Sequence, residues 1–200
     1  MNKLFSFANI AGIIFPVIMV LQIILSVFRM HNPYFNVAIY LVINGLWIAF
    51  FTLLIQASVK RSPIVPPSWI AIGAFAISLI AGCISSYGSI LIVNKSDNWE
   101  TIASLFSVSS VLHYIYAIAV AVAFFWLSKY FPKGSVLKAM CIVIGVVAVL
   151  DQISNLTIHP WKIEDESTRN MVQIGLSVFW ALCSFIPPTI FFIAFSKLKK

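Results

Sequence analysis

Residues 69–93, WIAIGAFAISLIAGCISSYGSILIV, form an apolar stretch that contains no charged side chain. The hydrocarbon core of a bilayer is about 30 Å thick, and roughly 20 residues of α-helix cross it. A helix pairs all of its own backbone groups, which lipid cannot do for it. The stretch therefore predicts a transmembrane helix.

Five further stretches of the chain share this character, and short segments rich in Pro, Asn or charge separate them. The six predicted spans cover residues 6–28, 36–59, 69–93, 102–127, 136–158 and 171–195. Their continuous apolar runs differ from the alternating segments of about ten residues in a transmembrane β-barrel. The sequence thus predicts an all-α, polytopic membrane protein, with residues 1–200 forming a single six-helix transmembrane bundle.

The composition excludes other classes of protein. Of the 200 residues, 61% are apolar and only 10% are charged, whereas about a quarter of the residues of a soluble domain are charged. An apolar content this high also excludes an intrinsically disordered chain. Three Cys, an odd number, exclude a framework of disulfides.

The basic residues predict the orientation of the spans. Nine of the 13 Lys and Arg residues flank the span ends that include both termini and the second and fourth loops. These nine are Lys3, Lys60, Arg61, Lys129, Lys133, Lys138, Lys197, Lys199 and Lys200. The positive-inside rule then predicts that both termini lie in the cytoplasm. We expect the chain to lie in the plasma (inner) membrane. The net charge of +7 indicates contact with anionic lipid headgroups and not with nucleic acid.

Small side chains at steps of three or four residues mark the helix faces that pack together in a membrane. The third predicted span has the longest such series. Its members are Ala71, Ala74, Ser78, Gly82, Ser85 and Ser89. We expect this face to lie against neighbouring helices.

Two ionisable residues lie inside predicted spans. A carboxylate at the centre of a transmembrane helix is disfavoured by roughly 2.5–3.5 kcal/mol, and such groups usually face a protein interior or a cavity. Asp151 lies about seven residues, roughly 10 Å, from the outer end of its span, and His113 lies about eleven residues, roughly 16 Å, from the outer end of its own. Consecutive antiparallel spans carry them, so we expect them to be neighbours.

Other polar side chains share this depth in the outer half of the membrane. Asn44, Gln22 and Ser85 lie on three other spans, while Gln152 and Asn155 accompany Asp151. The pattern predicts a polar pocket that opens to the outer side. Its predicted ligand-binding residues are Asp151, His113, Asn44, Gln22, Gln152, Asn155 and Ser85. The expected function is binding or transport of a small or amphipathic ligand.

Two alternatives remain open. The same polar residues could only join helices, in a structural or accessory subunit, or His113 and Asp151 could serve an intramembrane enzyme as acid and base. An enzyme is the less favoured of these, because the recognised catalytic motifs do not occur in the sequence. We therefore assign no catalytic residue, no metal ligand and no cofactor.

One pattern resembles a known group of proteins. Asn44-Gly45-Leu46 opens the core of the second span, and Leu112-His113 follows a polar outer loop near the start of the fourth. This resembles small prokaryotic six-helix integral membrane proteins of unknown function. The resemblance implies a six-helix membrane fold and no particular activity. The expected partners are the bilayer, a lipid or small amphipathic ligand, and another membrane protein or a second copy of the chain.

Overall fold

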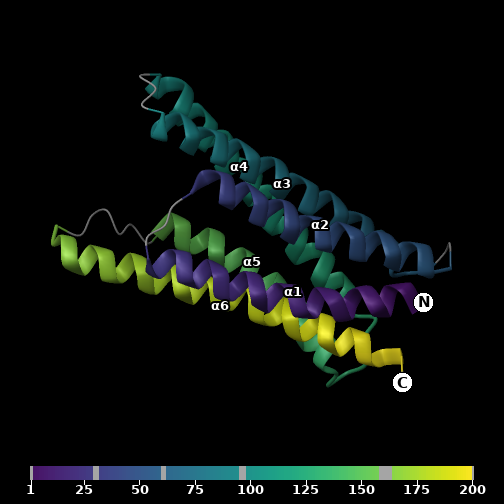
Figure 1. Cartoon of the computed structure of the whole chain (residues 1–200). Helices are drawn as coiled ribbons and strands as arrows, with labels where there is room; N and C mark the ends of the chain where they lie inside the picture. Colours follow the sequence, from purple (N-terminus) through teal and green to yellow (C-terminus); the bar gives the residue numbers. More distant parts are fainter. Residues whose placement is uncertain (1, 29–31, 60–61, 95–97, 158–163, 200) are drawn as a thin grey trace. The chain divides into compact units, whose positions relative to one another are not determined.

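The computed structural model describes residues 2–28, 32–59, 62–94, 98–157 and 164–199. Within these ranges the chain forms six α-helices, a terminal turn of 3-10 helix and no strand (Figure 1). The helices are α1 (Asn2–Val27), α2 (Pro33–Ala57), α3 (Val65–Val93), α4 (Trp99–Ser128), α5 (Val136–Thr157) and α6 (Glu166–Ser196). Each is long and apolar enough to cross a membrane. The predicted all-α class with six spans is confirmed.

The helices extend beyond several of the predicted spans, because polar residues at their ends act as caps. The Asn32 side chain accepts hydrogen bonds from the backbone nitrogens of Tyr34 and Phe35, so α2 begins at Pro33. Asp165 caps α6 in the same way, with Thr168 N donating to its Oδ2 over 2.7 Å. Hydrogen bonds from Thr168 also hold the pKa of Asp165 below its ordinary value. Such caps satisfy backbone donors that apolar composition alone does not predict.

The chain forms two compact units. The first comprises Met1–His31 and Ser128–Lys200, and it contains α1, α5 and α6. The second comprises Asn32–Leu127, and it contains α2, α3 and nearly all of α4. The single domain expected from the sequence stays a prediction.

In the first unit α1 packs against α6 in the opposite direction. The rings of Phe5 and Phe195 lie 5.8 Å apart, and those of Phe15 and Phe185 lie 6.1 Å apart. Because rising residue numbers on one helix meet falling numbers on the other, α1 and α6 are antiparallel. At Gly12 a Cβ would lie only 3.0 Å from the Ile193 side chain, so the missing side chain lets the two helices approach closely.

Helix α6 continues through two consecutive prolines. Pro187 and Pro188 are both buried, and the helix runs without interruption from Glu166 to Ser196. Proline lacks a backbone donor and leaves the carbonyl four residues earlier without its helical partner. Beyond them, Thr189 Oγ1 donates to the carbonyl oxygen of Phe185 over 2.7 Å. In this stretch of α6, the Thr189 side chain therefore donates a hydrogen bond to a helix carbonyl in addition to the backbone bonds.

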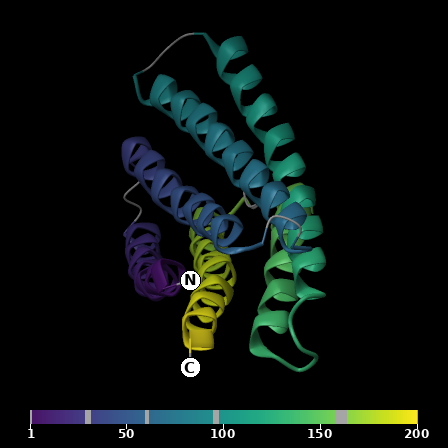
Figure 2. The same ribbon diagram turned by 90° about the vertical axis from the view of Figure 1, so that its right-hand side faces the viewer.

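In the second unit, aromatic rings form a cluster around Trp47. Its ring is stacked on Phe75 at 5.2 Å between centroids and meets Phe124 edge to face at 5.3 Å. Trp47 is only 2% exposed. In Figure 2 α2 (blue) lies along α3 (blue to teal), and the two helices pack together. The expected face of α3 is buried at Ala71, Ala74, Ser78 and Gly82.

The aromatic cluster predicts the first experimental outcome. Replacing Trp47 with Ala removes a buried side chain of α2 that contacts rings on α3 and α4. The free energy of unfolding should therefore fall by about 3–5 kcal/mol. Unfolding in mixed micelles of mild and denaturing detergent measures this change. Trp69→Ala is the matched control, because Trp69 is 59% exposed. Equal losses for the two variants would contradict the role of the cluster.

Candidate functional site

His113 of α4 lies where the three helices of the second unit meet. Its Nδ1 lies 2.9 Å from the carbonyl oxygen of Ser109 and 3.3 Å from Ser109 Oγ. Since a carbonyl can only accept, Nδ1 carries the hydrogen in this contact. Ser109 Oγ in turn donates to the carbonyl oxygen of Ala81 on α3 over 2.9 Å, so the chain of hydrogen bonds joins α4 to α3.

The other imidazole nitrogen of His113, Nε2, has no part in these contacts. With Nδ1 protonated, neutral imidazole presents a lone pair at Nε2. Nε2 takes part in none of the hydrogen bonds among the described residues. His113 is half-buried, so this acceptor lies in a partly protected position.

Tyr40 of α2 lies next to both α3 and α4 at this point. Its ring centroid lies 6.5 Å from that of His113, with the planes tilted by 57°. The ring also covers Gly82 of α3, where an added Cβ would lie 2.7, 2.8 and 2.9 Å from three ring atoms of Tyr40. Only a residue without a side chain fits there. We call Tyr40, Asn44, Ala81, Gly82, Ser109 and His113 the Tyr40–His113 junction.

Asn44 and Ser85, two further predicted ligand-binding residues, lie in or beside this junction. Asn44 follows Tyr40 by one helical turn, is 3% exposed, and donates from Nδ2 to the Tyr40 carbonyl oxygen over 2.8 Å. Ser85 is half-buried and follows Ala81 by one turn of α3. The second unit thus gathers Asn44, Ser85 and His113 on three helices that meet.

The remaining predicted residues belong to the first unit. In α5, Gln152 Nε2 donates to Asp151 Oδ2 over 3.0 Å, and Gln152 is 9% exposed. The side chain of Asn155 lies outside the part of the chain that the structure describes. In α1, Gln22 has a buried Oε1 that accepts no hydrogen bond from any described residue. That all seven residues share one pocket stays a prediction.

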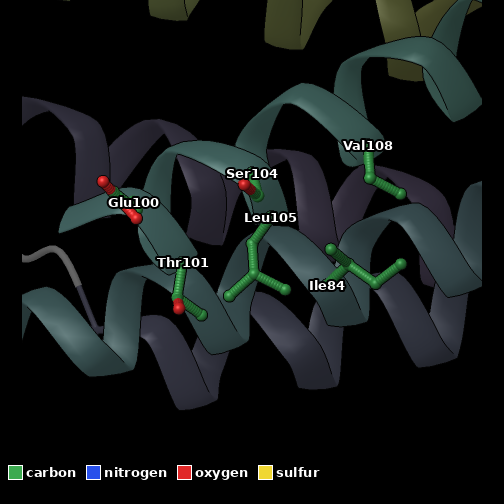
Figure 3. Close-up of a pocket in the computed structure, with 6 residues that line it drawn as sticks. All are labelled: Ile84, Glu100, Thr101, Ser104, Leu105 and Val108. Carbon is green, nitrogen blue, oxygen red and sulfur yellow. The ribbon is translucent and has the colours of Figure 1, made fainter. Parts of the chain in front are cut away.

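A second feature of the second unit is a groove between α3 and α4, with a cavity of about 380 Å³ (Figure 3). Its lining residues are Ile84, Glu100, Thr101, Ser104, Leu105 and Val108, which we call the α3–α4 groove. The volume falls within the range of small-molecule pockets in proteins. None of its residues was predicted as a ligand-binding residue from the sequence.

The sequence did contain a signal for this groove. Its five residues on α4 follow one another at helical spacing, with polar members first and apolar members after them. The predicted span began at residue 102, whereas α4 begins at Trp99. Glu100 and Thr101 were therefore assigned to a loop, although they belong to the same helical face as Leu105 and Val108.

Metal binding finds no geometric support in the described ranges. No three His, Cys, Asp or Glu side chains gather there in a way that could hold an ion. His31 and His159 lie outside these ranges.

The six apolar helices among the described residues make this chain a multi-pass membrane protein. The sequence matches no protein-family model, and neither a curated protein nor a solved structure matches it. The resemblance to six-helix membrane proteins of unknown function therefore remains one of sequence pattern.

The contact between Tyr40 and Gly82 predicts the effect of a single methyl group. Gly82→Ala should lower the free energy of unfolding by about 1–3 kcal/mol, because the Tyr40 ring must move away from α3. Gly73→Ala on the same helix is the control, since an added Cβ there has no described atom within 4 Å. Thermal unfolding in detergent compares the two. A Gly82→Ala variant as stable as the control would show that the two helices are not in close contact here.

Proposed function

We propose that this multi-pass membrane protein binds a small or amphipathic ligand through polar side chains in the outer half of its helices. The observation that supports the proposal is the state of His113. Its Nδ1 contacts the backbone of its own helix, while Nε2, which has a lone pair in the neutral imidazole, bonds to no described residue, and the side chain is half-buried. A ligand that carries an O–H or N–H group complements that lone pair.

The surroundings of His113 narrow the chemistry of the ligand. The Tyr40 ring stands 6.5 Å from the imidazole and offers an apolar, aromatic surface. Asn44 and Ser109 are each 3% exposed, and both use a side-chain donor within the protein. The ligand that suits this junction therefore has one hydrogen-bond donor attached to an apolar body.

A structural role is the second candidate, and a specific contact favours it. Ser109 Oγ donates to the carbonyl oxygen of Ala81, and this bond links α4 to α3 without any ligand. Hydrogen bonds between membrane helices are worth about 0.6 kcal/mol on average. In an accessory subunit, His113 would only hold Ser109 in place for this bond.

Two substitutions at position 113 separate these candidates. In His113→Asn the amide replaces Nδ1 but does not reach as far as Nε2, whereas in His113→Gln the longer side chain places an amide close to Nε2. If the junction binds a ligand, His113→Asn should lower ligand retention about tenfold, the equivalent of roughly 1.4 kcal/mol. His113→Gln should retain more ligand than His113→Asn does.

The measurement is mass spectrometry of the molecules that co-purify when the protein is extracted from membranes together with its lipids. Ser110→Ala is the control, because Ser110 is exposed and its hydroxyl donates to the carbonyl oxygen of Phe106 in its own helix. A molecule enriched with wild type and the control but lost with His113→Asn supports ligand binding. Identical co-purifying molecules for wild type and His113→Asn would favour the structural role.

The proposal also includes an orientation, with both termini in the cytoplasm of the plasma (inner) membrane. Antiparallel packing of α1 and α6 brings Lys3 and Lys197, both exposed, to the same end of the first unit. The anionic inner leaflet attracts Lys side chains next to a transmembrane helix.

Fusions to the C-terminus test this orientation. Green fluorescent protein fused after residue 200 should fluoresce, and alkaline phosphatase fused at the same place should be inactive. Each reporter functions on only one side of a bacterial inner membrane, so the pair of readouts checks itself. Active phosphatase together with a dark fluorescent fusion would place the C-terminus outside and contradict the proposal.

A further inference from the structure

We propose that the α3–α4 groove is a binding site for a cationic amphiphile, a molecule that joins an ammonium group to an apolar chain. This site is separate from the Tyr40–His113 junction and does not depend on ligand binding at His113. Five observations support it: the order of the lining residues, the depth of the groove, the charge of Glu100, the Ser104 hydroxyl, and the cavity volume of about 380 Å³.

The lining of the groove changes from polar to apolar along α4. Glu100, Thr101 and Ser104 lie near the start of the helix, and Leu105 and Val108 follow, with Ile84 of α3 beside them (Figure 3). Eight residues separate Glu100 from Val108, a rise of roughly 12 Å along the helix. An amphiphile has the same order of polar and apolar parts over such a length.

The groove also lies at a suitable depth for an amphiphile. Trp99 begins α4 and is 64% exposed. Tryptophan is enriched at the boundary between lipid headgroups and hydrocarbon. The polar end of the groove is then at headgroup depth, and its apolar end extends toward the membrane interior.

Glu100 determines the sign of the charge that the groove accepts. It is the one charged residue of the lining, and its side chain is exposed. Its carboxylate attracts an ammonium group and repels a sulfate or phosphate. A bare metal ion fits poorly, because Ca²⁺ takes six to eight oxygen ligands and three of the six lining residues are apolar.

One hydroxyl group in the groove, that of Ser104, differs from others on α4. Ser107 Oγ and Ser110 Oγ each donate to the carbonyl oxygen four residues earlier, both over 2.9 Å. Ser104 Oγ makes no such bond to a described residue, although Glu100, four residues earlier, is described. The Ser104 hydroxyl is therefore available as a hydrogen-bond partner for a polar head beside Glu100.

The test uses a photoreactive probe in which a diazirine-bearing alkyl chain carries a trimethylammonium head. A matched probe has the same chain with a sulfonate head. The full-length protein, reconstituted in lipid nanodiscs, is irradiated with each probe, and mass spectrometry locates the labelled residues. We expect the ammonium probe to label residues 84 and 100–108, and the sulfonate probe to label them several-fold less.

Two pairs of variants test the assignment of residues. Glu100→Gln should reduce labelling of the groove about fivefold, as expected for the loss of an ion pair worth about 1 kcal/mol. Glu166→Gln, which removes an exposed first-turn carboxylate from α6, should leave labelling unchanged. Val108→Trp should abolish labelling by filling the groove, whereas Val122→Trp, at a similarly exposed position further along α4, should not.

The outcomes separate the two proposals. Equal labelling by both probes, or unchanged labelling in Glu100→Gln, would overturn the cationic site, as would labelling confined to other residues. Thermal unfolding of each variant shows whether it has folded. His113→Asn should leave labelling of the groove unchanged, so failure at the groove and failure at the Tyr40–His113 junction are observed independently.

Discussion

The constraint on which this structure depends is that hydrocarbon offers no partner to a hydrogen-bonding group. Helices satisfy their own backbone, and several polar side chains bond back to the same helix. Thr52, Ser68 and Thr189 each donate to the carbonyl oxygen four residues earlier. Such side chains add little to recognition because their donors are already used. More informative are polar atoms such as Ser109 Oγ, which donates to another helix, and His113 Nε2, which bonds to no described residue.

The Tyr40–His113 junction and the α3–α4 groove use polar groups differently. At the junction, Ser109 connects His113 to the backbone of α3, so each polar contact also fixes how the helices pack. In the groove, Glu100, Thr101 and Ser104 line an open cavity and are exposed. Under the two proposals, a change at the junction would affect folding and ligand binding together, whereas a change in the groove would affect mainly ligand binding. In the two substitutions at position 113, an amide group takes the place of one or the other imidazole nitrogen for this reason.

Sequence reasoning succeeded where a property is averaged over many residues. Most side chains of each span are apolar, so the six helices follow from composition even when single positions are ambiguous. The helix ends were less predictable because one capping residue, such as Asn32 or Asp165, moves them by several positions. The same kind of error occurs at the start of α4. The predicted span begins after Glu100 and Thr101, whereas in the structure both residues belong to the helix.

The contacts of the predicted ligand-binding residues could not be predicted from the sequence, for a different reason. His113 was identified because a titratable group inside a span is unusual, but its link to α3 ends on a backbone carbonyl, that of Ala81, which every residue possesses. Tyr40 was missed because a tyrosine in a span is unremarkable until Gly82 is found beneath its ring. Gln152 was associated with Asp151 by adjacency alone, and the structure has a hydrogen bond between them.

The polar start of α6 has a consequence for the bilayer itself. The helix has 31 residues, a length of roughly 46 Å, which exceeds the hydrocarbon thickness of about 30 Å. Its opening residues, 166–170, are hydrophilic but helical, so in a bilayer we expect them to extend the helix beyond the hydrocarbon. A thicker or thinner membrane can then be accommodated by tilting of α6, without drawing a charge into the hydrocarbon or unwinding a turn.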